Sequence, residues 1–273
     1  MQFEELDVGY SAEAIRDYVT DAVAAKGTRR QPRFYAVGGS HLFGFADADS
    51  DVDVRGVHVV PAEEYAYLRE PDPEVTVNMH GTTDGFEAYA DCDLRSDELK
   101  HFGSLLVDAN FNVVELVLEA PVVMNGMPLE VDALRALVRE FLPMNVPHSY
   151  LGMAKSNYYK HLDPDKAEGY DPSAKRFLYV YRGLLGAQYV LDNEDVEANV
   201  RALADAVDAG DPALVDELVA LKRDAAVDHV PDVLEERARD AILSGFNALD
   251  PLPPVDKHGY RDAIDDWMRK VRA

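Results

Sequence analysis

Residues 37–55 decide the fold and read Val-Gly-Gly-Ser-His-Leu-Phe-Gly-Phe-Ala-Asp-Ala-Asp-Ser-Asp-Val-Asp-Val-Arg. An apolar run before them predicts a first strand over residues 33–37, which is followed by the turn Gly38-Gly39-Ser40. Residues 41–45 predict a short helix, and residues 52–60 predict a second strand. A glycine-serine turn in this place offers backbone N–H groups and a hydroxyl to phosphate oxygens.

Two acids stand at the start of the second strand. Asp51 and Asp53 alternate with two valines, so the strand carries both acids on one face and both valines on the other. The acids are about 7 Å apart along the strand and repel each other unless a positive charge lies between them. Mg²⁺ binds one or two carboxylates together with phosphate oxygens. An isolated Asp-x-Asp is common on acidic surfaces, so the predicted metal–nucleotide site rests on the strand, the turn and the acids together.

The same residues carry a resemblance to a known family. The turn at residues 38–40, ten residues, and then Asp-Val-Asp-Val at 51–54 resemble the signature of the DNA polymerase β-like nucleotidyltransferase superfamily. The strings at residues 39–45 and 50–57 are similar to one branch, the predicted nucleotidyltransferases associated with RNA repair. The resemblance implies an α+β fold: a mixed β-sheet flanked by helices in an N-terminal nucleotidyltransferase domain, followed by an all-helical C-terminal domain.

This resemblance also implies a reaction and a site. A nucleoside monophosphate passes from an NTP to an acceptor hydroxyl, and pyrophosphate is released. Asp51 and Asp53 are expected to hold Mg²⁺ or Mn²⁺, while Gly38, Gly39 and Ser40 bind the phosphates. Arg55 lies on the same face as the acids, where it either neutralises them or contacts the triphosphate.

The superfamily uses a third carboxylate on a neighbouring strand, which helps to bind a second metal and activates the acceptor hydroxyl. Residues 86–93 predict such a strand, and both Asp91 and Asp93 are candidates. In the branch, this acid precedes a Glu-Leu-x-x-Phe segment that opens a helix, seen here at residues 98–102. Counting back from that segment favours Asp93. In the branch, a lysine is commoner at the position of His101. If this chain keeps the role of that lysine, we expect Lys100 to carry it.

Strand patterns end after Pro147, and Pro143 and Pro147 indicate a boundary between domains at 1–145 and 146–273. The second domain predicts helices near residues 149–161, 174–191, 194–209, 212–224, 231–247 and 261–271. Lys175 and Arg182 fall on one face of the second of these helices. Either they pair along the helix and cover the core, or they close over the nucleotide; we expect them to bind the nucleotide.

Composition sets the remaining limits. The chain has 273 residues, 51 acids and 27 bases, and a formal net charge of −24, spread along its whole length as in proteins of a halophile's cytoplasm. No apolar run is long enough to span a membrane, the N-terminus lacks signal-peptide features, and the single Cys92 fits a reducing cytoplasm. Arg29, Arg30 and Arg33 form one dense basic cluster, which is either a solvated loop or a contact for phosphate or RNA.

The acceptor and the oligomeric state cannot be identified from these residues. An RNA 3′ end fits the branch, while a protein hydroxyl, as in toxin–antitoxin nucleotidyltransferases, and a small molecule stay open. The alternative to an enzyme is a non-catalytic module that binds a nucleotide or RNA. No other catalytic motif competes with the one at residues 37–55.

Overall fold

The protein is described by a computed structural model that covers residues 2–6, 8–27, 29–79, 81–224, 229–252 and 258–272, without the side chains of residues 142–144 and 258. Contacts between Cα atoms divide the chain into two compact units. The first consists of Met1–Leu42, Ala48–Val138 and Lys257–Ala273, and the second of Phe43–Asp47 and Arg139–Asp256. The first unit carries the β-sheet, and the second is helical.

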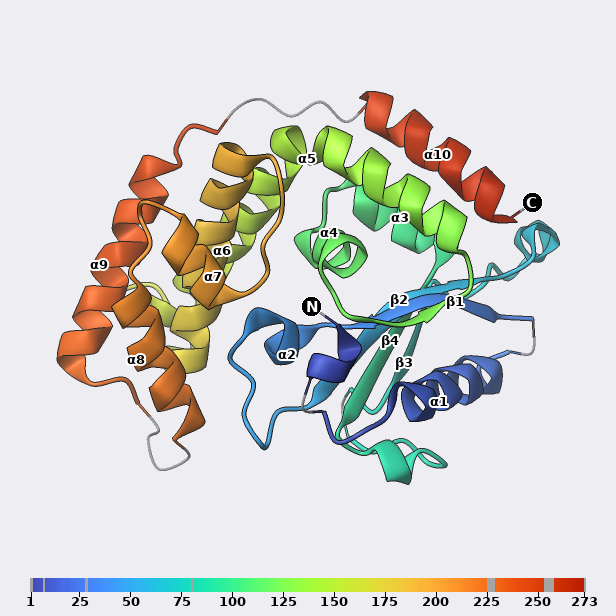
Figure 1. Cartoon of the computed structure of the whole chain (residues 1–273), viewed down its shortest axis with the longest axis horizontal. Helices are drawn as coiled ribbons and strands as arrows, with labels where there is room; N and C mark the ends of the chain where they lie inside the picture. Colours follow the sequence, from blue (N-terminus) through green and yellow to red (C-terminus); the bar gives the residue numbers. More distant parts are fainter. Residues whose placement is uncertain are drawn as a thin grey trace. The chain divides into compact units, whose positions relative to one another are not determined.

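The sheet of the first unit has five strands in the order β3-β4-β2-β1-β5 (Figure 1). Their bounds are Gln31–Val37 (β1), Val52–Val59 (β2), Glu74–Val77 (β3), Cys92–Glu98 (β4) and Val122–Asn125 (β5). β2 and β4 run parallel, whereas β1 pairs with β2 and β5, and β3 with β4, in antiparallel fashion. The predicted mixed sheet is therefore confirmed.

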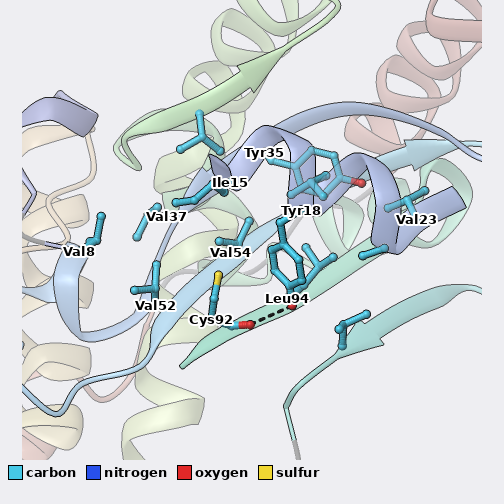
Figure 2. Packing of buried hydrophobic residues seen from close by; sticks show 14 of the residues in the cluster. Val8, Ile15, Tyr18, Val23, Tyr35, Val37, Val52, Val54, Cys92 and Leu94 are labelled. Carbon is cyan, nitrogen blue, oxygen red and sulfur yellow. Dashed lines mark hydrogen bonds between the residues drawn. The ribbon is translucent and has the colours of Figure 1, made fainter. Parts of the chain in front are cut away.

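One face of this sheet is buried beneath α1 (Ala12–Ala25), whose apolar stripe includes Ile15 and Tyr18 (Figure 2). Val52 and Val54 of β2 point into this core, as do Cys92 and Leu94 of β4. Side chains alternate along a strand, so the acids between these apolar residues lie on the opposite face. Ser11 caps the start of α1 by accepting a hydrogen bond from the Ala14 N–H at 3.1 Å.

Further helices belong to the first unit. They are α2 (Gly39–Phe43, with its last residue counted in the second unit), α3 (Leu99–Val107), α4 (Phe111–Leu118), the start of α5 (Pro128–Asn157) and α10 (His258–Arg272). α3 contacts β2 and β4, and α10 packs against α3 so closely that a Cβ on Gly103 would lie 2.5 Å from the Met268 sulfur. Trp267 Nε1 donates to the Glu130 carbonyl at 2.7 Å, which fixes α10 against α5.

Helices make up the second unit, as predicted. After the π-helical turn Tyr158–Leu162 come α6 (Ala174–Asn193), α7 (Val200–Ala206), α8 (Pro212–Arg223) and α9 (Asp232–Ala248). More than half of the residues of α6 are buried, and the helix contacts the other three. None of the helices in the described ranges is both long and apolar enough to cross a membrane.

Several predicted boundaries differ from the structure. The strand predicted over residues 86–93 is wrong: residues 87–89 form a 3₁₀ turn, and β4 begins only at Cys92. β3 and β5 were not predicted, because each has only four residues between turns. α5 runs through both Pro143 and Pro147, so the border predicted between residues 145 and 146 lies inside a helix, whereas the compact units divide after Val138.

Candidate active site

Asp53 and Asp93 lie side by side on neighbouring parallel strands. They are direct register partners in the β2–β4 pair, and both lie on the face opposite the α1 core. Adjacent strands are about 4.8 Å apart, so the two carboxylates extend from neighbouring backbones toward the same solvent space. Like charges in such a position repel each other unless a cation lies between them. Carboxylate oxygens are the ligands that Mg²⁺ and Mn²⁺ prefer, so this pair fits such an ion.

The two other acids of this region, Asp51 and Asp91, lie directly before β2 and β4. Asp51 is exposed and directly precedes β2, in line with Asp53. Asp91 lies in the turn before β4, where its carboxylate accepts a hydrogen bond from Tyr10 Oη and its carbonyl accepts one from the Val52 N–H at 2.8 Å. The structure therefore brings Asp93, and not Asp91, beside Asp53.

The glycine turn lies directly against Asp53. The Gly38 N–H donates to the Asp53 carbonyl at 2.8 Å. Gly39 has a φ of +61°, and a Cβ built there would lie 2.6 Å from Asp53 Cγ and 2.9 Å from its Cβ. Only glycine fits this position without displacing the acid, because it accepts the left-handed backbone and leaves room for the carboxylate. Ser40 follows on α2 and is buried.

Arg55 is two residues beyond Asp53 on the same face. Its Nη2 lies 3.4 Å from Asp53 Oδ1, and the two side chains are 30% and 25% exposed. A long, partly exposed pair of this kind contributes little to stability. Arg55 can therefore turn toward an anion at small cost.

A second cluster of ionisable groups on this face was missed from the sequence. Glu74 of β3, Asp97 of β4 and His101 of α3 bring ligand atoms within 4.8 Å of one another, which makes them a possible acidic metal site. Arg95 reaches the same place, with its Nη2 2.7 Å from Glu74 and 3.5 Å from Asp97. Burial raises the pKa of Asp97, and Arg95 and His101 oppose that rise. Within the described residues, Asp51, Asp53 and Asp93 do not form such a close group.

The missed cluster depends on β3, whose Glu-Val-Thr-Val alternation at residues 74–77 was the available signal. Glu74 and Asp97 are register partners of the β3–β4 pair, so the cluster cannot be predicted without that strand. His101, noted above as the departure from the branch's lysine, lies 3.6 Å from Asp97.

Lys175 and Arg182 belong to the second unit. Arg182 is fully buried, and its guanidinium carbon lies 3.7 Å from the centre of the Phe43 ring. Tyr179, on the same helix, packs edge-to-face against that ring. Lys175 is exposed and lines a cavity of about 270 Å³ that Lys222 also lines. Nucleotide binding by Lys175 and Arg182 stays a prediction.

The basic cluster is engaged within the first unit. Arg29 forms ion pairs with Glu63 and Glu64, and Arg33 donates to Gln31 Oε1 at 2.8 Å. Arg30 Nη1 donates to His58 Nε2 at 2.6 Å, while His58 Nδ1 lies 2.8 Å from Ser96 Oγ. Since Arg30 can only donate, His58 is neutral and carries its proton on Nδ1, from which it donates to Ser96.

Comparison with known proteins identifies the family. The model of RlaP, the RNA repair pathway DNA polymerase beta family, matches residues 25–270. A nucleotidyltransferase-like protein from Exiguobacterium sibiricum 255-15 is 14% identical, with 95% of this chain and 74% of that chain covered, but its TM-score of 0.30 is too low to support an argument. No curated protein matches the chain. Because the family model spans both the acid-bearing sheet and the helical unit, the chain belongs to the RNA repair pathway DNA polymerase beta family, a nucleotidyltransferase-like family of the polymerase β type.

Proposed function

We propose that the protein is a metal-dependent nucleotidyltransferase that moves a nucleoside monophosphate from an NTP to an acceptor hydroxyl. The observation that carries this proposal is the pairing of Asp53 with Asp93 in register, with the Gly39 backbone directly against the Asp53 carboxylate. Membership of a polymerase β-type family supports the same reaction class. The expected cofactor is Mg²⁺ or Mn²⁺, held by Asp51, Asp53 and Asp93.

In this reaction the acceptor oxygen forms a bond to the α-phosphorus, and the bond from that phosphorus to the bridging oxygen breaks. The electron pair of the broken bond leaves with pyrophosphate. Asp93 takes the hydroxyl proton and later passes it to solvent. A divalent metal held by Asp51, Asp53 and Asp93 would neutralise the negative charge that develops during this displacement. The turn at residues 38–40 holds the phosphates, and Arg55 exchanges Asp53 for a phosphate oxygen.

We propose RNA as the acceptor, because the family model describes an RNA repair pathway. A hydroxyl on a protein is the alternative within the same chemistry. The alternative from another class is a module that binds a nucleotide or RNA and catalyses nothing. Lys175 and Arg182 are proposed to contribute to NTP binding, Lys175 by contact and Arg182 through the aromatic packing of its helix.

One labelling experiment tests this proposal. The full chain is incubated with α-³²P-labelled NTPs, Mg²⁺ and RNA in molar KCl, because salt screens the self-repulsion of a chain with a net charge of −24. We expect label on the RNA, and none with Asp53→Asn. Transfer at the wild-type rate by Asp53→Asn would refute the site. Label on protein and not on RNA would identify a protein hydroxyl as the acceptor. Tight NTP binding without any transfer would favour the non-catalytic module.

A further inference from the structure

The loop between β3 and β4 is closed by one buried side chain, that of Asn78. Asn78 follows directly after β3, is 4% exposed and has a φ of +64°. Asparagine is one of the few residues with a side chain that adopt this left-handed backbone at small cost. A buried amide at such a position needs hydrogen-bond partners for both its oxygen and its nitrogen.

The oxygen of this amide is held by Thr83. The Thr83 N–H donates to Asn78 Oδ1 at 2.7 Å, and the Asn78 N–H donates back to Thr83 Oγ1 at 2.9 Å. Because an N–H requires an acceptor, this pair fixes which end of the amide is oxygen. The nitrogen therefore points the other way, toward one carbonyl just before β4 and one in its first residue.

The nitrogen contacts the start of β4. Asn78 Nδ2 donates to the Tyr89 carbonyl at 2.6 Å and lies 3.4 Å from the Cys92 carbonyl. The Cys92 carbonyl also accepts a hydrogen bond from Tyr18 Oη at 2.9 Å, drawn as a dashed line in Figure 2. β3 pairs with β4 only as far as Val77 and Leu94. Beyond that pair, the side chains of Asn78 and Tyr18 supply the hydrogen-bond donors that the backbone of a longer β3 would have supplied.

The Cys92 carbonyl belongs to the peptide unit whose nitrogen is that of Asp93. A peptide unit is planar, so fixing its oxygen also fixes the direction in which the Asp93 Cα leaves it. Tyr18 contacts this carbonyl from the α1 core and Asn78 contacts it from the end of β3, while the Asp93 side chain lies on the face opposite that core, beside Asp53. We infer that Asn78, supported by Tyr18, is a positioning residue that holds Asp93 at the place where its carboxylate pairs with that of Asp53.

This inference rests on the proposed function, because that function assigns a metal ion to Asp93. The variant Asn78→Asp tests the inference. Aspartate has the size of asparagine, tolerates the left-handed backbone and still accepts from the Thr83 N–H. The second carboxylate oxygen of the aspartate would face the Tyr89 and Cys92 carbonyls. Repulsion between these oxygens would then replace the two hydrogen bonds that the Asn78 amide donates. Tyr18→Phe is the milder variant, because it removes one hydroxyl and keeps the ring in the core.

Mn²⁺ affinity of the full chain in molar KCl, measured by electron paramagnetic resonance, is the first readout. We expect Asn78→Asp to weaken binding about tenfold, as the loss of a residue that orients a ligand does. In an Asp93→Asn background the same change should add nothing, because Asn78 acts through Asp93. An equal further loss in that background would overturn the inference. Thr83→Val is the matched control: it opens the same loop but keeps both amide donors, and we expect binding within about twofold of wild type.

Hydrogen exchange is the second readout and requires neither metal nor activity. In Asn78→Asp, amide exchange should rise at residues 92–95, whereas in Thr83→Val it should rise only within the loop at 81–86. Unchanged exchange at 92–95 in Asn78→Asp would overturn the inference. If the wild-type chain binds no Mn²⁺ and transfers no label, the proposed function fails, and the exchange pattern still decides whether Asn78 holds the Asp93 backbone.

Discussion

Replacing Gly39 by alanine should separate the effect of backbone strain from the effect of moving Asp53. At a φ of +61° an alanine costs about 1–2 kcal/mol of stability for the left-handed backbone alone. The new methyl would also overlap Asp53 Oδ2 and lie 2.6 Å from Asp53 Cγ, whereas ordinary contacts begin at 3.4 Å, so Cγ alone must move by about 0.8 Å and the oxygen by more. Rotation of the Asp53 side chain does not relieve this, because its Cβ would still be only 2.9 Å away.

A displacement of about 1 Å at a reacting centre can cost about 100-fold in rate. We therefore expect Gly39→Ala to lower the single-turnover rate constant of label transfer about 100-fold, with a loss of about 1–2 kcal/mol in the free energy of unfolding. Gly9→Ala is the matched control, since Gly9 has a φ of +67° and a Cβ there would meet nothing within 4 Å. It should show the same loss of stability and keep its activity.

The assay is transfer of α-³²P label under single-turnover conditions, with urea unfolding of each variant in the same molar KCl. Single turnover isolates the chemical step from product release. Activity of Gly39→Ala within about threefold of Gly9→Ala would refute the reasoning, because it would mean that the position of the Asp53 carboxylate does not limit the reaction.

Three other changes give sharp expectations. Asp93→Asn should lower kcat more than it raises KM for the NTP, while Asp91→Asn stays active. If steady-state kinetics showed an inactive Asp91→Asn and an active Asp93→Asn, Asp91 would be the third carboxylate. Burial, and secondly Arg30, lower the pKa of His58 from 6.5 to about 3. Its contribution to stability is therefore complete above pH 6.5 and is lost as pH falls toward 3, by about 4–5 kcal/mol at most; a His58→Gln variant with the same acid sensitivity in urea titrations would contradict this. Arg272→Met should cost about 2 kcal/mol in urea unfolding, because Arg272 Nη2 lies 2.8 Å from the buried Glu98; unchanged stability would show that the pair is not structural.

Local patterns predicted the part of the site that lies within one stretch of chain. The alternation at residues 51–54 and the turn at 38–40 gave β2 and its acids, because both signals depend only on neighbouring residues. The nearness of Asp93 to Asp53 depends on the register between β2 and β4, and composition does not encode register. Counting from a family segment selected Asp93; its catalytic role stays a prediction.

Other features were hidden for physical reasons. Asn78 contacts the start of β4 through backbone carbonyls that are eleven and fourteen residues away in sequence, and no periodicity in the sequence marks this contact. Arg182 had the sequence spacing of a surface cation, yet it lies over an aromatic ring inside the second unit. The prolines at 143 and 147 are local signals that disfavour a helix, but α5 continues through them.

The return of α10 to the first unit has a consequence for biosynthesis. Residues 258–272 pack on α3 and bond to α5, but they are translated only after the whole second unit. The sheet and its acids can thus emerge from the ribosome long before the helix that covers α3 exists. During that interval, Gly103 and the buried Glu98 lack their α10 contacts, so the nascent first unit depends on the second being made before it can close. A ribosome stalled before residue 258 should therefore hold a first unit that is more sensitive to protease than the same unit in the released chain.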